Sequence, residues 1–363
     1  MKPYCALAVQ AGWPYITRRE DIKKVAIPHL KRITELAFNT ANWELPIKLI
    51  AYPEGALSGW ASGSGGSTSH AKGHLQFCRE MAAESVPGEE TELLGEIAKT
   101  YDVYLIATMK ACDPEVCKDR YFTIAVLINP RGELILKFHK LFLPAAGQSV
   151  TPHDVWDTFV AKYGDGPDAF FKVADTEIGR IGLSVAMDGG FAELYRGLAL
   201  QGAEIVYRPS YIEPLVSRLG RNVWEIQNRA RAIDNCFYMI CPNDGPVYQG
   251  ETIGLQSAYN WAGGRSMIVD YKGQVLFECE YATEGHACAL INIEELRDWR
   301  DRNPFNSVPL LRTEYFRKLY EKPIYPKNLY LDKAPGGRDE FEAEIRKTIH
   351  KLQEQGIYLT PSK

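Results

Sequence analysis

The sequence lacks the features of a membrane or secreted protein. It contains no run of about 18 apolar residues, the length that a membrane-spanning helix requires. The apolar run near the N-terminus is only about five residues long, which is too short for a signal peptide and predicts a first strand. We therefore expect a cytoplasmic protein without a membrane partner.

The sequence also lacks the patterns of a metal site and of a nucleic-acid-binding surface. None of the eight cysteines is paired with a histidine at the spacing of a zinc site, so we expect no structural metal. Most cysteines lie inside apolar runs, where the thiol acts as a small apolar group, and we expect them to be reduced. The net charge of −4 is spread along the chain without a basic stripe, which argues against a nucleic-acid partner.

The composition is that of a globular protein with a large core. Of the 363 residues, 45% are hydrophobic and 24% are charged. Helical and strand patterns alternate, which favours an α/β fold, but hairpin signals in 122–140 and 265–280 argue against a purely parallel sheet. We therefore expect mixed sheets, or two sheets packed together, with helices outside them.

The periodicity of apolar residues predicts most of the elements. A helix over 20–41 should be kinked at Pro28, because proline removes a backbone donor inside a helix. We expect a main domain over 1–295 and a C-terminal extension over 296–363 that packs on the domain or on a partner subunit. The other predicted helices span 91–102, 223–236, 294–302 and 340–356, and the other predicted strands span 47–55, 103–109, 181–187, 204–207, 237–243 and 286–293.

Three positions at strand ends could carry chemistry together. Glu54 follows one apolar strand, Lys140 ends another, and Ala186 comes before the turn Asp188-Gly189-Gly190. Taken singly, these would be a solvated acid, a lysine that extends to the surface and a small packed residue. Because the carboxyl ends of strands gather the chemistry of open α/β sheets, the three positions together predict a site.

Five sequence blocks, in order, resemble those of the nitrilase superfamily, the carbon–nitrogen hydrolases. They are "YPEGALSGW", "GELILKFHKLFLP", "IGLSVAMDGGFAELYRGLALQGAEIVYRPS", "RARAIDN" and "GGRSMIVDYKGQVL". The resemblance covers residues 4–295 and looks most like the aliphatic amidase and formamidase branch. It implies a four-layer α-β-β-α sandwich with mixed sheets.

The resemblance also implies a Glu-Lys-Cys triad. Glu54 would be the general base, and Lys140 would donate to the oxyanion. Lys137 is the less favoured match to the lysine of this block. The nucleophile position is occupied by Ala186 instead of cysteine. The backbone N–H of Met187 would help to bind the oxyanion. No metal or organic cofactor is implied.

Other residues near these strand ends are candidates for binding the substrate. Arg208 could bind a substrate carboxylate or form a strand-end salt bridge. Asp188 could be catalytic, but a cap on the helix that starts near Phe191 is favoured. The Gly/Ser-rich loop over 61–70 could be a lid. The complete set of substrate-binding candidates is Trp60, Gly189, Gly190, Phe191, Arg208 and Tyr211.

One expected part of the supporting site is missing. Many members of the superfamily carry a second Glu shortly after the lysine, but residues 141–157 contain no Glu. His153 or Asp154 could take its place.

Ala186 cannot act as a nucleophile, and two explanations remain open. It is either an engineered Cys-to-Ala change or a mark of a natural relative that binds without catalysis; the otherwise complete site favours the first. We expect the active parent to be an amidohydrolase for a small carboxamide or N-carbamoyl compound, working through a thioester. Alternatives are a nitrilase, although the Trp-Glu typical after the nucleophile is absent, and a binding or scaffold protein. By resemblance, we also expect a homo-oligomer, a dimer or larger, with an exchanged C-terminal tail.

Overall fold

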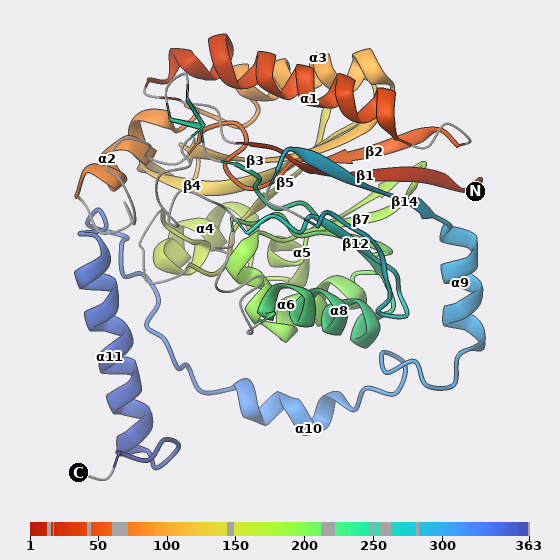
Figure 1. Ribbon diagram of the computed structural model, residues 1–363. Coiled ribbons are helices and arrows are strands. Elements are labelled where there is room, and N and C mark those ends of the chain that lie inside the picture. Colours follow the sequence, from red (N-terminus) through yellow and green to blue (C-terminus); the bar gives the residue numbers. More distant parts are fainter. Residues whose placement is uncertain are drawn as a thin grey trace.

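The computed structural model describes most of the chain (Figure 1). The described residues are 1–12, 16, 18–41, 45–59, 72–143, 149–211, 222–246, 248–249, 252–253, 263–280 and 283–361. Trp60 and the loop over 61–70, which were candidates for the pocket wall and the lid, lie outside these residues.

Two six-stranded mixed sheets form the centre of the molecule. The first has the order β14-β1-β2-β3-β4-β5 and the second the order β13-β12-β9-β8-β7-β6. The first sheet consists of β1 (Tyr4–Gln10), β2 (Ile47–Ala51), β3 (Tyr104–Asp113), β4 (Cys117–Ile128), β5 (Leu134–His139) and β14 (Gly285–Ile291). The second consists of β6 (Val173–Thr176), β7 (Gly179–Leu183), β8 (Ile205–Tyr207), β9 (Tyr238–Cys241), β12 (Met267–Val269) and β13 (Val275–Glu278); β10 (Tyr248–Gln249) pairs with β11 (Thr252–Ile253) apart from both.

Helices cover the outer face of each sheet (Figure 1). α1 and α3 lie over the first sheet, and α6 and α8 lie over the second. The described α-helices are α1 (Ile27–Thr40), α2 (Lys72–Met81), α3 (Glu89–Tyr101), α4 (Trp156–Tyr163), α5 (Pro167–Phe170), α6 (Ala192–Leu200), α8 (Val223–Asn235), α9 (Ile293–Arg302), α10 (Thr313–Arg317) and α11 (Arg338–Glu354).

The two-residue period of the strands divides the core into layers. In β1, Ala6 and Ala8 pack between the two sheets, whereas Leu7 and Val9 pack beneath α1 and α3. Both faces of this strand are therefore apolar, as expected for a strand buried on both sides. The prediction of a four-layer α-β-β-α sandwich with mixed sheets is confirmed.

Pro28 changes the helical geometry without ending the helical run. A five-residue π-helical stretch, Ile22–Ala26, comes first, and α1 begins at Ile27 with Pro28 in its first turn. Proline is tolerated there because the first turn of an α-helix has no intrahelical acceptor for its backbone donors.

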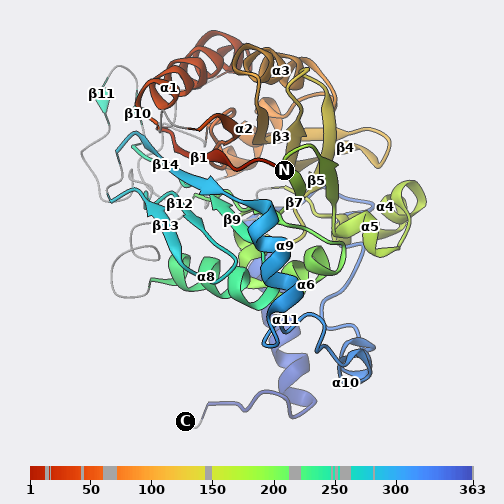
Figure 2. The same cartoon turned by 90° about the vertical axis from the view of Figure 1, so that its right-hand side faces the viewer.

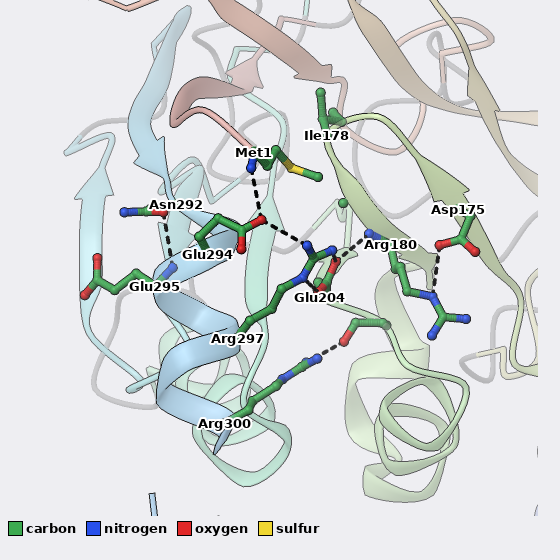
Figure 3. A network of polar contacts seen from close by, with 12 residues as sticks. Met1, Asp175, Ile178, Arg180, Glu204, Asn292, Glu294, Glu295, Arg297 and Arg300 are labelled. Carbon is green, nitrogen blue, oxygen red and sulfur yellow. Dashed lines mark hydrogen bonds and ion pairs between the residues drawn. The ribbon is translucent and has the colours of Figure 1, made fainter. Parts of the chain in front are cut away.

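An ion-pair network connects α9 to both sheets of the sandwich (Figure 3). Arg297 donates to Glu204 at 2.7 Å and to Glu294 at 3.0 Å, and Glu294 also accepts from the amino group of Met1 at 3.1 Å. Arg300 donates to the carbonyl of Ala203 at 2.6 Å. The helix therefore connects the N-terminus, which leads into β1 of the first sheet, to the residues directly before β8 of the second sheet.

Beyond α9 the chain is largely exposed, but it contacts the sandwich again at Tyr330, which is buried and whose carbonyl accepts from Arg120 at 3.1 Å. In Figure 1 and Figure 2 it runs below the body through α10 to α11, which projects away from the sheets. Large apolar side chains in this segment are open to solvent, with Phe305 88% and Leu359 89% exposed. No helix among the described residues is both long and apolar enough to span a membrane.

Candidate active site

A buried lysine–glutamate pair lies where two strands of the first sheet end. Glu54 follows β2 and Lys140 follows β5, and the two residues are only 3% and 2% exposed. The Lys140 ammonium donates to Glu54 Oε1 at 2.8 Å. Lys137, the alternative register, instead donates to Asp113 at 3.0 Å. The structure therefore brings together the two residues that the blocks implied.

The second sheet contributes a strained turn after β7. Ala186 has a φ of +45°, a left-handed value that is uncommon for a residue with a side chain. Its backbone N–H donates to the carbonyl of Pro209 at 2.8 Å, and a 3₁₀ turn, Ala186–Gly190, follows directly. A sharp strand-to-helix turn of this kind presents the nucleophile in enzymes of the α/β-hydrolase fold.

Asp188 joins this turn to the segment that carries Lys140. Its carboxylate accepts from the backbone N–H of Val185 at 2.8 Å, of Phe142 at 2.9 Å and of Leu141 at 3.2 Å. The prediction that Asp188 caps the helix near Phe191 is wrong, because α6 begins at Ala192 without a side-chain cap. The carboxylate instead connects two loops, because it accepts from backbone donors of both the turn after β7 and the segment after Lys140.

The charge of Asp188 depends on a balance of opposing effects. Complete burial raises the pKa of its carboxyl group to about 7, although Lys140 and the three backbone donors act to lower it. The group therefore titrates near neutrality.

Arg208 contacts the turn through the carbonyl of Ala186. Its guanidinium is buried, donates to Asn228 and Gln227 at 2.5 Å each, and makes longer contacts of 3.4 Å with the carbonyl of Ala186. It also lies over the ring of Trp224, with 4.9 Å between the guanidinium carbon and the ring centroid. The partners that the structure describes for Arg208 are amides, a carbonyl and an indole rather than the acid of a strand-end salt bridge, and binding of a substrate carboxylate stays a prediction.

The two glycines of the turn have opposite surroundings. A Cβ at Gly189 would lie 2.0 Å from the guanidinium carbon of Arg208, whereas a Cβ at Gly190 would have nothing within 4 Å. Gly189 is thus required for the close approach of Arg208, and Gly190 is exposed.

Aromatic and apolar groups lie at the rim of the site. Phe191 stacks on Phe142 with 3.5 Å between ring centroids and 10° between planes. Met187 is exposed, and Tyr211 is half-buried beside residues that the structure does not describe. Phe142 follows Lys140, Met187 and Phe191 follow the nucleophile position, and Tyr211 lies after β8.

The replacements considered for a second glutamate are engaged elsewhere. The Asp154 carboxylate accepts from the backbone and hydroxyl of Thr151, both at 2.8 Å, and His153 packs against Trp156 and Tyr325.

A second buried lysine, Lys110 on β3, was not among the predicted site residues; its ammonium donates to Thr123 at 2.7 Å. Its only signal in the sequence is a lysine inside the apolar run over 103–111.

No cluster of three or more His, Cys, Asp or Glu side chains in the described part of the chain is arranged to hold a metal ion. The groups assembled here are acids, bases and hydrogen-bond donors.

Comparison with known proteins places the chain in a family. The carbon-nitrogen hydrolase profile matches residues 8–301. The chain is 27% identical over 222 residues to omega-amidase NIT2-B of Xenopus laevis, covering 61% of this chain and 73% of that protein. It is also 27% identical over 250 residues to a formamidase of Bacillus cereus, covering 68% of this chain but only 64% of the formamidase.

Solved structures share the fold. A carbon-nitrogen hydrolase from Helicobacter pylori superposes with a TM-score of 0.64 at 20% identity, covering 88% of this chain and 99% of that chain. A Cys-to-Ala mutant of a Nesterenkonia amidase from the nitrilase superfamily gives 0.59 at 19% identity, with 87% and 97% covered. Together with the profile match over most of its length, this shows that the chain belongs to the carbon-nitrogen hydrolase family of the nitrilase superfamily.

Proposed function

We propose that this fold hydrolyses the C–N bond of a small carboxamide or N-carbamoyl compound when residue 186 is cysteine. The observation that carries the proposal is the Lys140–Glu54 contact of 2.8 Å, buried beside the left-handed turn at Ala186. The omega-amidase and formamidase relatives support an amide substrate. With Ala186, the chain itself is inactive, because a methyl group cannot attack a carbonyl carbon.

Each group has a step to perform in this reaction. Glu54 takes the proton of the thiol, and the thiolate forms an S–C bond with the amide carbon. The Lys140 ammonium and the Met187 N–H donate to the oxyanion that develops. The C–N bond then breaks, and Glu54 returns the proton to the departing ammonia or amine.

The second half of the reaction releases the acid. Glu54 takes a proton from water, the oxygen attacks the thioester carbon, and the S–C bond breaks to regenerate the thiol. Every proton is exchanged between Glu54, water, sulfur and nitrogen, so the reaction balances without another reactant.

We also propose that Ala186 is an engineered change rather than a natural loss. The buried Glu54–Lys140 pair and the strained turn are intact, although a protein that only binds has no need of either. We further propose a cytoplasmic location, which the thiol form of the eight cysteines supports.

The test is the variant Ala186→Cys, assayed for ammonia or amine release with aliphatic amides, aryl amides, ureido acids and nitriles. We expect turnover of an amide or ureido compound, and no turnover by the chain with Ala186. Preferential turnover of a nitrile would replace the amidase proposal with a nitrilase. A folded Ala186→Cys protein that turns over no member of the panel would favour a binding or scaffold protein.

A matched pair of variants tests the base. In the Ala186→Cys background, Glu54→Gln should lower kcat/KM by about 100-fold or more, because the thiol loses its proton acceptor. Glu84→Gln changes a surface glutamate that is 92% exposed and should leave kcat/KM unchanged. Equal activities of the two variants would contradict the role of Glu54.

A further inference from the structure

A pocket lies where the C-terminal extension returns to the main domain. Arg79 of α2 and Arg120 and Tyr121 of β4 line it from the domain, and Ala334 and Pro335, which precede α11, line it from the extension. Figure 1 shows α2 and the start of α11 on the same side of the molecule. The pocket is separate from the pair of Glu54 and Lys140, because neither of these residues lines it.

Hydrogen bonds anchor the extension beside this pocket. The backbone N–H of Tyr330 donates to the carbonyl of Asp154 at 3.0 Å, and the carbonyl of Tyr330 accepts from the Arg120 guanidinium at 3.1 Å. The ring of Tyr330 is buried against the core of the first sheet. The side of the pocket that the extension forms is therefore held in place by contacts with the domain.

Arg120 brings a buried guanidinium with an unused donor to the pocket. The residue is only 9% exposed, and its partners are the carbonyls of Tyr330 at 3.1 Å and of Asp119 at 3.2 Å, which carry no charge. Its Nη2 forms no hydrogen bond or ion pair with the residues that the structure describes. Because burying a charge is costly without an opposite charge nearby, this site favours an anion.

Arg79 adds a second guanidinium from α2. It is exposed and has no hydrogen bond or ion pair in the described part of the chain. Asp119 also lines the pocket, but it is exposed and pairs with neither arginine. Two positive charges against one negative charge leave the pocket positive. The stretches 60–71 and 144–148, which lie outside the described residues, contain no Asp or Glu in their sequence.

The pocket also has room and apolar surface for more than a bare anion. Its volume is about 190 Å³. A cavity of about 150 Å³ holds a benzene molecule, so this pocket can take a ligand of similar size. Val150, Ala334 and Pro335 line it together with the arginines. Apolar walls with a few charged groups are typical of sites for small organic ligands.

We propose that this pocket binds a small organic acid of about the size of benzoate or hexanoate. The carboxylate lies at Arg79 and Arg120, since a guanidinium matches the planar geometry of a carboxylate. The apolar part of the ligand packs against Val150, Ala334 and Pro335. The ligand thus contacts the domain and the extension at once. The proposal is independent of the hydrolysis proposed above and is tested on the chain as it stands, because binding requires no turnover.

The experiment compares ligands that separate charge from apolar surface. Isothermal titration calorimetry with the full chain, at physiological salt, measures the binding of benzoate and hexanoate. Benzyl alcohol and hexanol keep the apolar part without the charge, and inorganic phosphate keeps a charge without the apolar part. We expect the acids to bind at millimolar concentration, and the alcohols and phosphate to bind at least about tenfold more weakly. An alcohol or phosphate that binds as tightly as the acids would overturn the assignment of the ligand.

Replacing the arginines tests where the carboxylate binds. Arg79→Gln should weaken the binding of benzoate by about tenfold, because a charge-assisted hydrogen bond is lost. Arg120→Gln should weaken it at least as much. Arg120 also holds Tyr330, so Arg79→Gln carries the test if Arg120→Gln does not fold. Arg131→Gln, in the turn at the other end of β4, is the matched control and should leave the affinity unchanged, because its side chain is 73% exposed and does not line the pocket.

A second pair of variants tests the contribution of the extension. Ala334→Leu adds bulk on the extension's side of the pocket without a change in charge, and should weaken the binding of benzoate. Ala343→Leu, on an exposed position of α11, adds the same bulk away from the pocket and should have no effect. Binding that is unchanged in both Arg79→Gln and Ala334→Leu takes place elsewhere and would overturn the proposal. The absence of acid binding at millimolar concentration would also overturn it.

Discussion

At the scale of single residues, Gly189 and Gly190 provide a sharp test of the turn. Gly189→Ala should lower the free energy of unfolding by about 1–3 kcal/mol, because the new Cβ would collide with the Arg208 guanidinium. Gly190→Ala should change it by less than about 0.5 kcal/mol, since the space is open. Urea denaturation of both variants measures the difference, and equal losses would show that Arg208 does not constrain the turn.

Asp188 should make stability depend on pH near neutrality. Its pKa is about 7 in the folded protein and about 3.9 when unfolded, so the folded state binds more protons between these values. The free energy of unfolding should therefore fall as pH rises from about 4 to about 7, by about 1.4 kcal/mol per unit from this group.

The variant Asp188→Asn isolates this effect. It cannot titrate, so its stability profile between pH 4 and 7 should be flatter than that of the parent, as measured by urea denaturation at several pH values. Parallel profiles would mean that the backbone donors keep the carboxylate charged throughout this range.

The sequence was informative about residues whose role depends on local context. Glu54, Lys140 and Ala186 stand at strand ends, and apolar runs show strand ends directly. Asp188 and Lys110 could not be placed in this way, because their partners come from other strands and loops. The local preference of Asp for helix starts suggested a cap, but long-range donors decided its position.

At the scale of elements, a buried cluster holds the end of β5. Asp113 Oδ2 accepts from Tyr163 at 2.7 Å, from His139 at 2.9 Å and from Lys137 at 3.0 Å. Burial alone would raise the pKa of Asp113, but these three donors outweigh burial and hold the pKa well below its usual range. The cluster therefore fixes the residue that directly precedes Lys140.

Breaking this cluster should destabilise the fold and loosen the site. Asp113→Ala leaves the buried His139 and the partly buried Lys137 and Tyr163 without their acceptor and should cost about 3–5 kcal/mol in thermal or urea unfolding. Asp119→Ala, on the exposed part of the same hairpin, is the control and should cost little. A similar loss in both variants would mean that the hairpin itself, rather than the cluster, is sensitive.

Elements with a clear apolar period could be predicted, and their ends could not. The helix over 223–236 and the hairpin over 265–280 match α8 and the β12–β13 pair closely. The strand over 103–109 extends in the structure to Asp113, because β3 pairs with β4 as far as its hairpin. The apolar pattern is interrupted at Lys110, but the strand stays mostly buried and its pairing with β4 continues to Asp113.

At the scale of the whole molecule, the segment after α9 is incompletely packed in the single chain. Phe305, Leu310, Leu319 and Leu359 are all more than half exposed. Apolar surface of this kind is usually covered by another molecule. We expected the extension to pack on the domain or on a partner subunit: Tyr330 packs on the domain, and packing of the exposed side chains on a second copy of the chain remains a prediction.

Light scattering can test this expectation. At micromolar concentration the full chain should be a dimer or larger, and truncation after Arg302 should weaken the assembly or abolish it. Replacing Leu319 and Leu359 together by Ser should act in the same direction as truncation, because it removes apolar contact area. A monomeric full chain would contradict the expectation.

The left-handed backbone at Ala186 should itself have a measurable cost. A residue with a Cβ in this conformation costs about 1–2 kcal/mol relative to an ordinary one, whereas glycine adopts it freely. After the entropy that glycine adds to the unfolded chain, Ala186→Gly should stabilise the protein by about 0.5–1 kcal/mol. A loss of stability would show that the methyl group makes packing contacts that outweigh the strain.

The same turn has a consequence for protein engineering. Pro209 and Arg208 hold the backbone at residue 186 through its own N–H and C=O groups, so no contact of the side chain is needed to shape the turn. The backbone therefore fixes the direction of the Cα–Cβ bond at position 186, whichever side chain is placed there. Serine, cysteine or selenocysteine placed there would be presented in a common orientation, so differences in their reactivity would report the chemistry of the atom alone.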